Sequence, residues 1–219
     1  EKGVNVDIVG LAPTPCVAYL ASAIKKYSAG VVVSASHNPA EDNGIKILDS
    51  KGEKITRSIE KEIEFYLEKD ISAPKNTTRQ GIIKNCEEAT KHYVNWLRLE
   101  AFPNLDLSGV KILVDCANGA ASTIAGEILD AFGAEATLIN ASPDGININK
   151  KCGATHPNVC AKKIQEGNYE IGLSLDGDAD RIIMCDEKSN IIDGDQIIAA
   201  LATRWKNKKM LKGGVVGTL

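Results

Sequence analysis

Two short polar stretches of the chain carry side chains that could perform chemistry. The first is the run SASHNP at residues 34–39, which places hydroxyl and imidazole groups directly after an apolar run. The second is the run DGDAD at residues 176–180, in which three carboxylates alternate with small residues. Like charges this close repel one another strongly unless a cation joins them, and hard oxygen ligands suit Mg2+ or Ca2+. The sequence therefore predicts a hydroxyl-bearing loop and a divalent-cation loop.

The serine run, together with DNGIK at residues 42–46, resembles the active-site serine loop of the α-D-phosphohexomutase family. Within that family, the motif SASHNP is most similar to that of the bacterial phosphoglucosamine mutases. Residues 149–157 resemble a stretch typical of the same branch of the family. The aspartate run, followed by Arg181, resembles the family's metal loop. The resemblance covers essentially the whole chain and implies an α/β fold of tandem three-layer α/β/α mixed-sheet domains.

The resemblance implies a role for each residue of the two runs. Ser36 is expected to be phosphorylated and to hand its phosphoryl group to a sugar phosphate. A phosphate oxygen on Ser36 is expected to bind one Mg2+ together with three carboxylates. These carboxylates belong to Asp176, Asp178 and Asp180. The implied cofactors are thus one Mg2+ and a phosphoserine.

Three further side chains are expected to serve the transfer. Lys46 matches the family's lysine that is proposed as general acid/base, and a cationic neighbourhood would lower its pKa toward that use. Arg181 offers a planar fork to phosphate oxygens. His37 either orients the phosphoserine or a sugar hydroxyl, or is a structural histidine in a turn. The net reaction implied is the interconversion of glucosamine 6-phosphate and glucosamine 1-phosphate through a bisphosphate, which feeds UDP-N-acetylglucosamine and cell-wall synthesis.

Other interpretations of the same residues stay open. A phosphomannomutase or phosphoglucomutase of the same family would use the same chemistry. A non-catalytic Ca2+-binding module is suggested because the three aspartates and Glu187 occupy the first, third, fifth and twelfth places of an EF-hand loop, although Arg181 stands where that loop needs glycine. A phosphatase with Asp176 as nucleophile would leave the serine run unexplained.

The periodicity of apolar residues predicts the elements that position these loops. Strands are expected at residues 4–9, 29–33, 45–47, 111–115, 136–140 and 170–175. Helices are expected near residues 15–24, 56–69, 87–100 and 123–132, with another that ends near residue 205. Thr14 is expected to cap the first helix, and the strand–helix–strand order at residues 4–33 predicts a parallel strand pair. The serine run would then follow its strand at the edge of a sheet where ligands bind.

The domain organisation is expected to follow the family. Residues 1–84 would form the later part of a first domain, residues 85–190 a second domain, and residues 191–219 the beginning of a third. Residues 70–81 are typical of a linker, and residues 213–219 predict the start of another strand. We do not expect Glu1 to be the natural beginning. The family's first strand, most of its third domain and its fourth domain are expected to be missing, so the fragment alone is expected to be inactive.

Composition argues against several other classes of protein. The chain holds 26 Lys and Arg against 29 Asp and Glu, and 5% aromatic residues, which disfavours a nucleic-acid partner. Its apolar runs are far shorter than a membrane span. Six scattered cysteines favour reduced thiols in a cytoplasmic protein, and Cys152, His156 and Cys160 lack a fourth ligand for structural zinc. A small-molecule sugar phosphate is the expected partner, and a homodimer is left open.

Overall fold

The computed structural model describes residues 3–69, 80–86 and 88–217, and the chain divides into two compact units. Unit 1 consists of Glu1–Ser34 and Asn43–Leu105, and unit 2 consists of Ala35–Asp42 and Asp106–Leu219. The serine run from Ala35 onward therefore belongs to unit 2, although the strands on either side of it belong to unit 1. The predicted domain borders after residues 84 and 190 stay a prediction. Most of the predicted linker lies outside the described residues.

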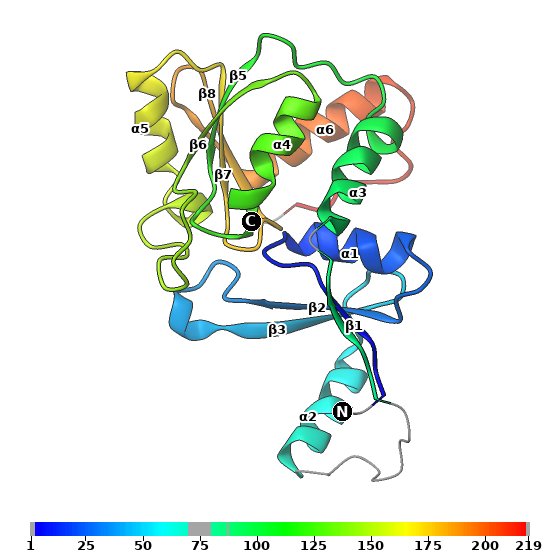
Figure 1. The fold of residues 1–219 in the computed structure, drawn as a ribbon. Coiled ribbons are helices and arrows are strands. Elements are labelled where there is room, and N and C mark those ends of the chain that lie inside the picture. Colours follow the sequence, from blue (N-terminus) through cyan, green and yellow to red (C-terminus); the bar gives the residue numbers. More distant parts are fainter. Residues whose placement is uncertain (1–2, 70–79, 87, 218–219) are drawn as a thin grey trace. The chain divides into compact units, whose positions relative to one another are not determined.

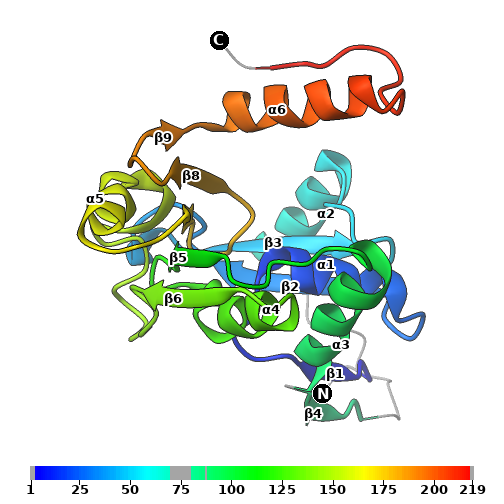
Figure 2. The same cartoon turned by 90° about the horizontal axis from the view of Figure 1, so that it is seen from above.

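Unit 2 is built on a mixed sheet. Its strands are β5 (Lys111–Asp115), β6 (Glu135–Ile139), β7 (Ile171–Leu175), β8 (Ile182–Asp186) and β9 (Ile191–Ile192). Their order is β6-β5-β7-β8-β9, and Figure 2 shows the sheet from β6 at one edge to β9 at the other. The pairs that β5 makes with β6 and β7 are parallel, whereas β7 with β8 and β8 with β9 are antiparallel. The three strands predicted here are confirmed, and the sheet is mixed as expected.

Helices cover both faces of this sheet (Figure 1). Ile112 and Val114 of β5 belong to a cluster with Ala125, the first residue of one helix. Leu113, between them in sequence, packs in a second cluster with Cys160 of another helix. Side chains of a strand alternate between its two faces, so the apolar run of β5 serves both layers. This arrangement confirms the predicted three layers. The two helices are α4 (Ala125–Ala131) and α5 (Asn158–Glu166).

The remaining segments of unit 2 differ in part from the predictions. The helix expected at residues 123–132 is split into a 3-10 turn, η3 (Ala120–Thr123), and α4, because Ile124 between them has a φ of −127°. The last helix, α6 (Gly194–Asn207), ends near the predicted residue and begins with a capping box of Asp193 and Gln196. The strand predicted from residue 213 is wrong for the described residues up to 217, because that stretch forms no strand pairing there.

Unit 1 contains an antiparallel hairpin of β2 (Ala29–Ser34) and β3 (Gly44–Asp49), which flanks the serine run on both sides. Gly30 of this hairpin approaches the first helix so closely that a Cβ there would lie 2.9 Å from Cγ1 of Val17. The structure confirms the strands predicted at residues 29–33 and 45–47, and it confirms the three helices predicted in this unit. The helices are α1 (Thr14–Ala23), α2 (Arg57–Glu68) and α3 (Ala89–Trp96), the last continued by a π-helical turn, η2 (Leu97–Ala101).

Two predictions for unit 1 are wrong. The strand β1 (Val6–Ile8) does not pair with β2, because it runs parallel to β4 (Ile83–Asn85), a strand that the sequence did not predict. Main-chain bonds extend this pairing, from the N–H of Val6 to the carbonyl of Ile82 and from the N–H of Cys86 to the carbonyl of Ile8. Thr14 is not the cap of α1, because Pro13 holds that position and Thr14 is already helical.

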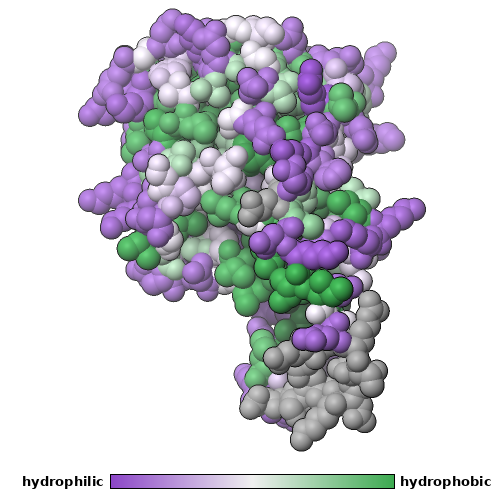
Figure 3. Space-filling view, in the orientation of Figure 1, coloured by the Kyte–Doolittle hydropathy of each residue, from purple (hydrophilic) through white to green (hydrophobic). Residues whose placement is uncertain are grey.

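The surface of unit 1 carries exposed apolar side chains on its strands. Val31, Val33 and Ile45 are 59%, 68% and 67% exposed, on the face of the hairpin opposite to Val32 and Leu48. Figure 3 shows hydrophobic residues gathered on the surface over β1 and β2. Over the described part of the chain, every helix is too short or too polar to span a bilayer.

The packing of α5 on the sheet predicts the effect of a small substitution in β7. A Cβ at Gly172 would collide with Sγ of Cys185 and lie 2.7 Å from Sγ of Cys160. We expect Gly172→Ala to lower the free energy of unfolding by about 1–3 kcal/mol, because both sulfurs are buried and the core cannot expand freely. Urea denaturation followed by circular dichroism measures this change. Gly194→Ala is the control, since nothing lies within 4 Å of a Cβ there; equal effects of the two changes would contradict the packing.

Candidate active site

The two polar runs singled out in the sequence meet within unit 2. The serine run leads directly into the 3-10 turn η1 (Ala40–Asp42), and the aspartate run connects β7 to β8. The hydroxyl of Ser36 donates a hydrogen bond to Oδ2 of Asp176, with 3.1 Å between the oxygens. A side chain suited to accept a phosphoryl group therefore lies against a carboxylate of the predicted metal loop.

The main-chain carbonyl of Ser36 accepts two hydrogen bonds from other parts of unit 2. One comes from the N–H of Gly177 at 2.9 Å, and the other from Nδ2 of Asn149 at 2.7 Å. A Cβ at position 177 would lie 2.5 Å from that carbonyl oxygen, so the approach requires glycine. Ser36 has a φ of +54°, in the left-handed region that non-glycine residues seldom occupy. These contacts hold the serine in a conformation that its backbone does not favour.

Asn149 contacts the serine run twice and was not predicted from the sequence. Its Nδ2 also donates to the carbonyl of Asn38 at 2.8 Å. The sequence offers two signals there. Residues 144–158 are polar and lack a helical or strand period, and residues 149–157 resemble a stretch typical of the phosphoglucosamine mutase branch. Because its partners are main-chain carbonyls, no pattern of residue types marks this position in advance.

Asp115, at the end of β5, is a second residue that the sequence did not single out. Its side chain is 0% exposed, and its two carboxylate oxygens accept the N–H groups of Ala117 at 3.0 Å and Gly153 at 2.9 Å. The carbonyl of Ala117 in turn accepts the N–H of Asn149 at 2.8 Å. The contacts to the serine run are thus connected to the central strand of the sheet.

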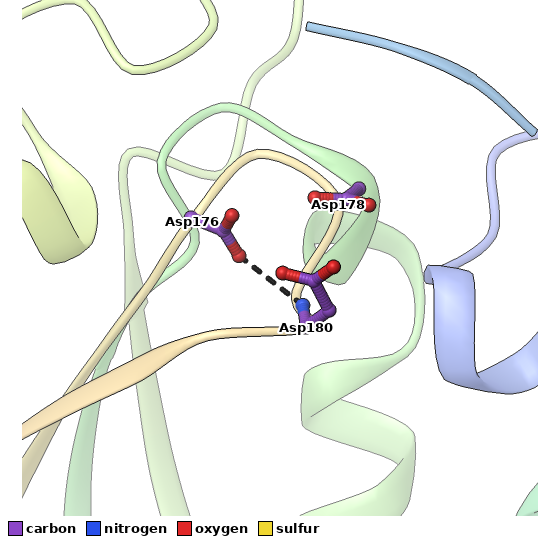
Figure 4. Close-up of side chains that lie close together, drawn as sticks. All are labelled: Asp176, Asp178 and Asp180. Carbon is purple, nitrogen blue, oxygen red and sulfur yellow. Dashed lines mark hydrogen bonds between the residues drawn. The ribbon is translucent and has the colours of Figure 1, made fainter. Parts of the chain in front are cut away.

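The three aspartates of the metal loop turn their carboxylates toward a common space (Figure 4). One ligand oxygen of each lies within 4.8 Å of the others, and Asp176 and Asp178 are 0% exposed, whereas Asp180 is exposed. Oδ1 of Asp176 accepts the N–H groups of Asp180 at 3.1 Å and Arg181 at 3.0 Å, which orients its carboxylate. Among the residues described, this group alone has the composition and spacing of a metal site.

Charge in this loop favours a bound cation. Burial raises the pKa of Asp176 above its ordinary value of 3.8, and the charges of Asp178 and Asp180 raise it further. The N–H of Arg181 and the hydroxyl of Ser36 lower that pKa in part. A divalent cation among the carboxylates would offset both the burial and the repulsion. The oxygen donors fit a hard cation such as Mg2+ or Ca2+.

The flanks of the loop contradict the EF-hand version of a Ca2+-binding module. An EF-hand loop joins two helices, whereas this loop joins the antiparallel strands β7 and β8. The N–H of Asp176 donates to the carbonyl of Arg181 at 3.3 Å, and the N–H of Ala179 donates to the carbonyl of Asp176 at 3.0 Å, so the loop is a tight strand connection. The aspartate spacing alone therefore does not identify the motif.

The other expected site residues are placed as follows. Arg181 extends from the same loop, with its side chain 59% exposed and its Nε 3.9 Å from Oδ1 of Asp180. Nδ1 of His37 is buried and makes no hydrogen bond within the described residues. Lys46 lies on β3 opposite Val32, in unit 1. Arg181 and His37 thus share a unit with Ser36 and Lys46 does not, and the roles of these side chains stay predictions.

Comparison with known proteins tests the resemblance. Residues 1–74 match a family model described as phosphoglucomutase/phosphomannomutase, alpha/beta/alpha domain I, and residues 88–190 match the model of domain II of the same family. The chain belongs to the phosphoglucomutase/phosphomannomutase family. This confirms the family and fold class inferred from the serine and aspartate runs.

The chain is similar to known proteins both in sequence and in structure. A phosphoglucosamine mutase of Pelagibacter ubique is 47% identical over all of the chain, which spans about half (49%) of that relative's length. A solved phosphoglucomutase/phosphomannomutase family protein from Burkholderia thailandensis has a TM-score of 0.77 and 26% identity, over 95% of the chain and 46% of the solved structure. An N-acetylphosphoglucosamine mutase of Aspergillus fumigatus, solved with GlcNAc-6P and magnesium, shares the fold with a TM-score of 0.51 and 23% identity, over 90% of the chain and 53% of its own.

The geometry of the metal loop predicts the effect of removing one charge. We expect Asp178→Asn to weaken Mg2+ binding at least about tenfold, because the amide supplies no negative charge to the cation. Isothermal titration of the 219-residue chain with Mg2+ measures the affinity. Asp130→Asn, on the exposed side of α4, is the matched control and should leave the affinity unchanged. Equal Mg2+ affinity of wild type and Asp178→Asn would count against the aspartate loop as the metal site.

Proposed function

We propose that this chain is the phosphoserine- and metal-bearing part of a phosphoglucosamine mutase. The enzyme would interconvert glucosamine 6-phosphate and glucosamine 1-phosphate by way of a phosphoserine and a bisphosphate. The observation that carries the proposal is the 3.1 Å hydrogen bond between the Ser36 hydroxyl and Asp176 within the predicted metal loop. Curated relatives with 41–47% identity, all named phosphoglucosamine mutase, support the choice of sugar phosphate.

The proposed transfer needs orientation, charge neutralisation and movement of a proton. Asp176 and the contacts to the Ser36 carbonyl orient Oγ, which carries the phosphoryl group between turnovers. A bound Mg2+ would supply positive charge to the transferring group, whose transition state is loose. Arg181 would bind phosphate oxygens through its guanidinium group. Lys46 would take the proton of the attacking sugar hydroxyl, and His37 would orient that hydroxyl or the phosphoserine.

The surroundings of the reaction belong to the same proposal. The partner would be a small-molecule sugar phosphate, and the enzyme would act in the cytoplasm without nucleic acid or membrane; whether it forms a homodimer is left open. The six scattered cysteines, none of them in a C-x-x-C pair, support a reducing compartment. A phosphomannomutase or phosphoglucomutase of the same family is the alternative, and it would use the same residues with another sugar.

Transfer to the serine is tested by labelling. We expect the chain, incubated with Mg2+ and 32P-labelled glucose 1,6-bisphosphate, to acquire one label on Ser36, as located by peptide mass spectrometry. Ser36→Ala should take none, because the acceptor oxygen is gone. Ser34→Ala is the matched control in the same run and should be labelled as wild type is. Labelled Ser36→Ala, or an unlabelled wild type, would contradict the proposal.

Net turnover is tested separately. Because the chain spans about half (49%) of the length of its relative, we expect it to convert glucosamine 6-phosphate to glucosamine 1-phosphate at a negligible rate even when Ser36 is labelled. Phosphorus NMR of the sugar phosphates over time measures the conversion. Sustained turnover by the purified 219 residues would show that this length suffices and would overturn the expectation.

A further inference from the structure

Asn149 is a buried polar residue that contacts the serine run although the two are far apart in the sequence. Its side chain is 7% exposed, and Nδ2 donates to the carbonyl oxygens of Ser36 at 2.7 Å and Asn38 at 2.8 Å. Both hydrogens of the amide are therefore committed to the main chain of the loop that carries the hydroxyl. A third contact, from the N–H of Gly177, reaches the same Ser36 carbonyl at 2.9 Å.

The orientation of this amide follows from its partners. The two atoms facing Nδ2 are carbonyl oxygens, which only accept hydrogen bonds, so the nitrogen must point at them. The other end of the amide, Oδ1 of Asn149, is buried and has no hydrogen-bond partner within the described residues. A buried acceptor left unsatisfied opposes stability, so the amide is better explained by what its nitrogen holds than by a gain in folding energy.

The backbone at position 149 narrows the choice of residue. Its φ is +57°, in the left-handed region that glycine, asparagine and aspartate tolerate best. Of these three, glycine has no side chain and an ionised aspartate only accepts hydrogen bonds. Asparagine combines tolerance of this backbone with two hydrogens to donate. The residue type thus satisfies both demands of the position.

The amide is itself held in place by the sheet. The N–H of Asn149 donates to the carbonyl of Ala117 at 2.8 Å. The fully buried carboxylate of Asp115, at the end of β5, accepts the N–H groups of Ala117 and Gly153. A Cβ at Gly153 would lie 2.5 Å from Cβ of Ala117, so the two loops are pressed together. A donor fixed in this way can impose a conformation on the serine run.

We propose that Asn149 is a positioning residue for phosphoryl transfer at Ser36, an inference that rests on the proposed function. Its amide and the N–H of Gly177 hold the carbonyl of Ser36, which keeps that residue left-handed with Oγ directed at Asp176. Without the amide, the Ser36 carbonyl keeps only the bond from Gly177 and Asn38 loses its contact, so Ser36 returns more easily to negative φ, which turns its hydroxyl away from the carboxylate. Asn149 itself does not touch the phosphoryl group.

The first test follows the loop alone, without any chemistry. Hydrogen exchange measured by mass spectrometry on peptides that cover residues 35–42 should be faster in Asn149→Gly than in wild type, because glycine keeps the backbone and removes the two donors. Asn140→Gly is the matched control, since Asn140 also has a positive φ, +47°, and follows β6 outside the polar segment 144–158. Exchange at 35–42 that is the same in Asn149→Gly as in wild type would overturn the proposal.

The second test follows the transfer. In single-turnover labelling with 32P-labelled glucose 1,6-bisphosphate, Asn149→Gly should lower the maximum rate of Ser36 phosphorylation by up to about 100-fold, with little change in the half-saturating concentration. Asn149→Asp should be slowed as well, because it has the size of asparagine but turns an acceptor toward two carbonyls. Mg2+ affinity, measured by calorimetry, should stay within about twofold in both, since neither change removes a metal ligand.

The outcomes separate this proposal from the function on which it rests. If wild type is labelled and Asn149→Gly reaches the same maximum rate, the positioning role is wrong and the proposed function stands. If wild type takes no label while Asn149→Gly loosens residues 35–42, the proposed function fails and the hold on the loop is supported. A loss of rate in Asn140→Gly equal to that in Asn149→Gly would also overturn the proposal, because it would show a general effect of glycine.

Discussion

The carbonyl oxygen of Ser36 is the point on which the site depends. It accepts hydrogen bonds from Gly177 on the metal loop and from Asn149 on the polar segment, and so joins three stretches of chain at one atom. A serine with a φ of +54° is not stable in that conformation by its own preference. The fold therefore fixes Ser36 through its main chain, and the direction of its side chain follows from that restraint.

In the metal loop the backbone conformation is stable and the charges are unfavourable, whereas at Ser36 the backbone conformation is the unfavourable part. The backbone of the metal loop is well supported, since the carboxylate of Asp176 accepts two N–H groups from the loop that follows it. Its charges are not compensated, because the buried carboxylates of Asp176 and Asp178 and the exposed one of Asp180 lie close together. A cation bound among these carboxylates would offset their repulsion without rebuilding the backbone.

The elements that carry the site were predictable because their signals are local. The apolar runs of β5 and β7 end abruptly in turn residues, and the same is true of β2 before the serine run. The pairing of β1 with β4 was not predictable, because β4 has three residues and its partner lies far away in the sequence. Asn149 and Asp115 were missed for a related reason. They act on main-chain groups, which every residue possesses, so residue types alone do not identify the partners of these two side chains.

The chain leaves unit 1 after Ser34 and returns to it at Asn43, so eight residues encoded with one unit are physically part of the other. A genetic crossover placed between residues 43 and 105 would combine the serine run of one parent with the carboxylates and the Asn149 amide of another. From the sequence, such a crossover would look like an exchange of whole units. It would in fact combine a serine run from one parent with an Asn149 amide from the other, so the hydrogen bonds to the Ser36 carbonyl would no longer come from one sequence.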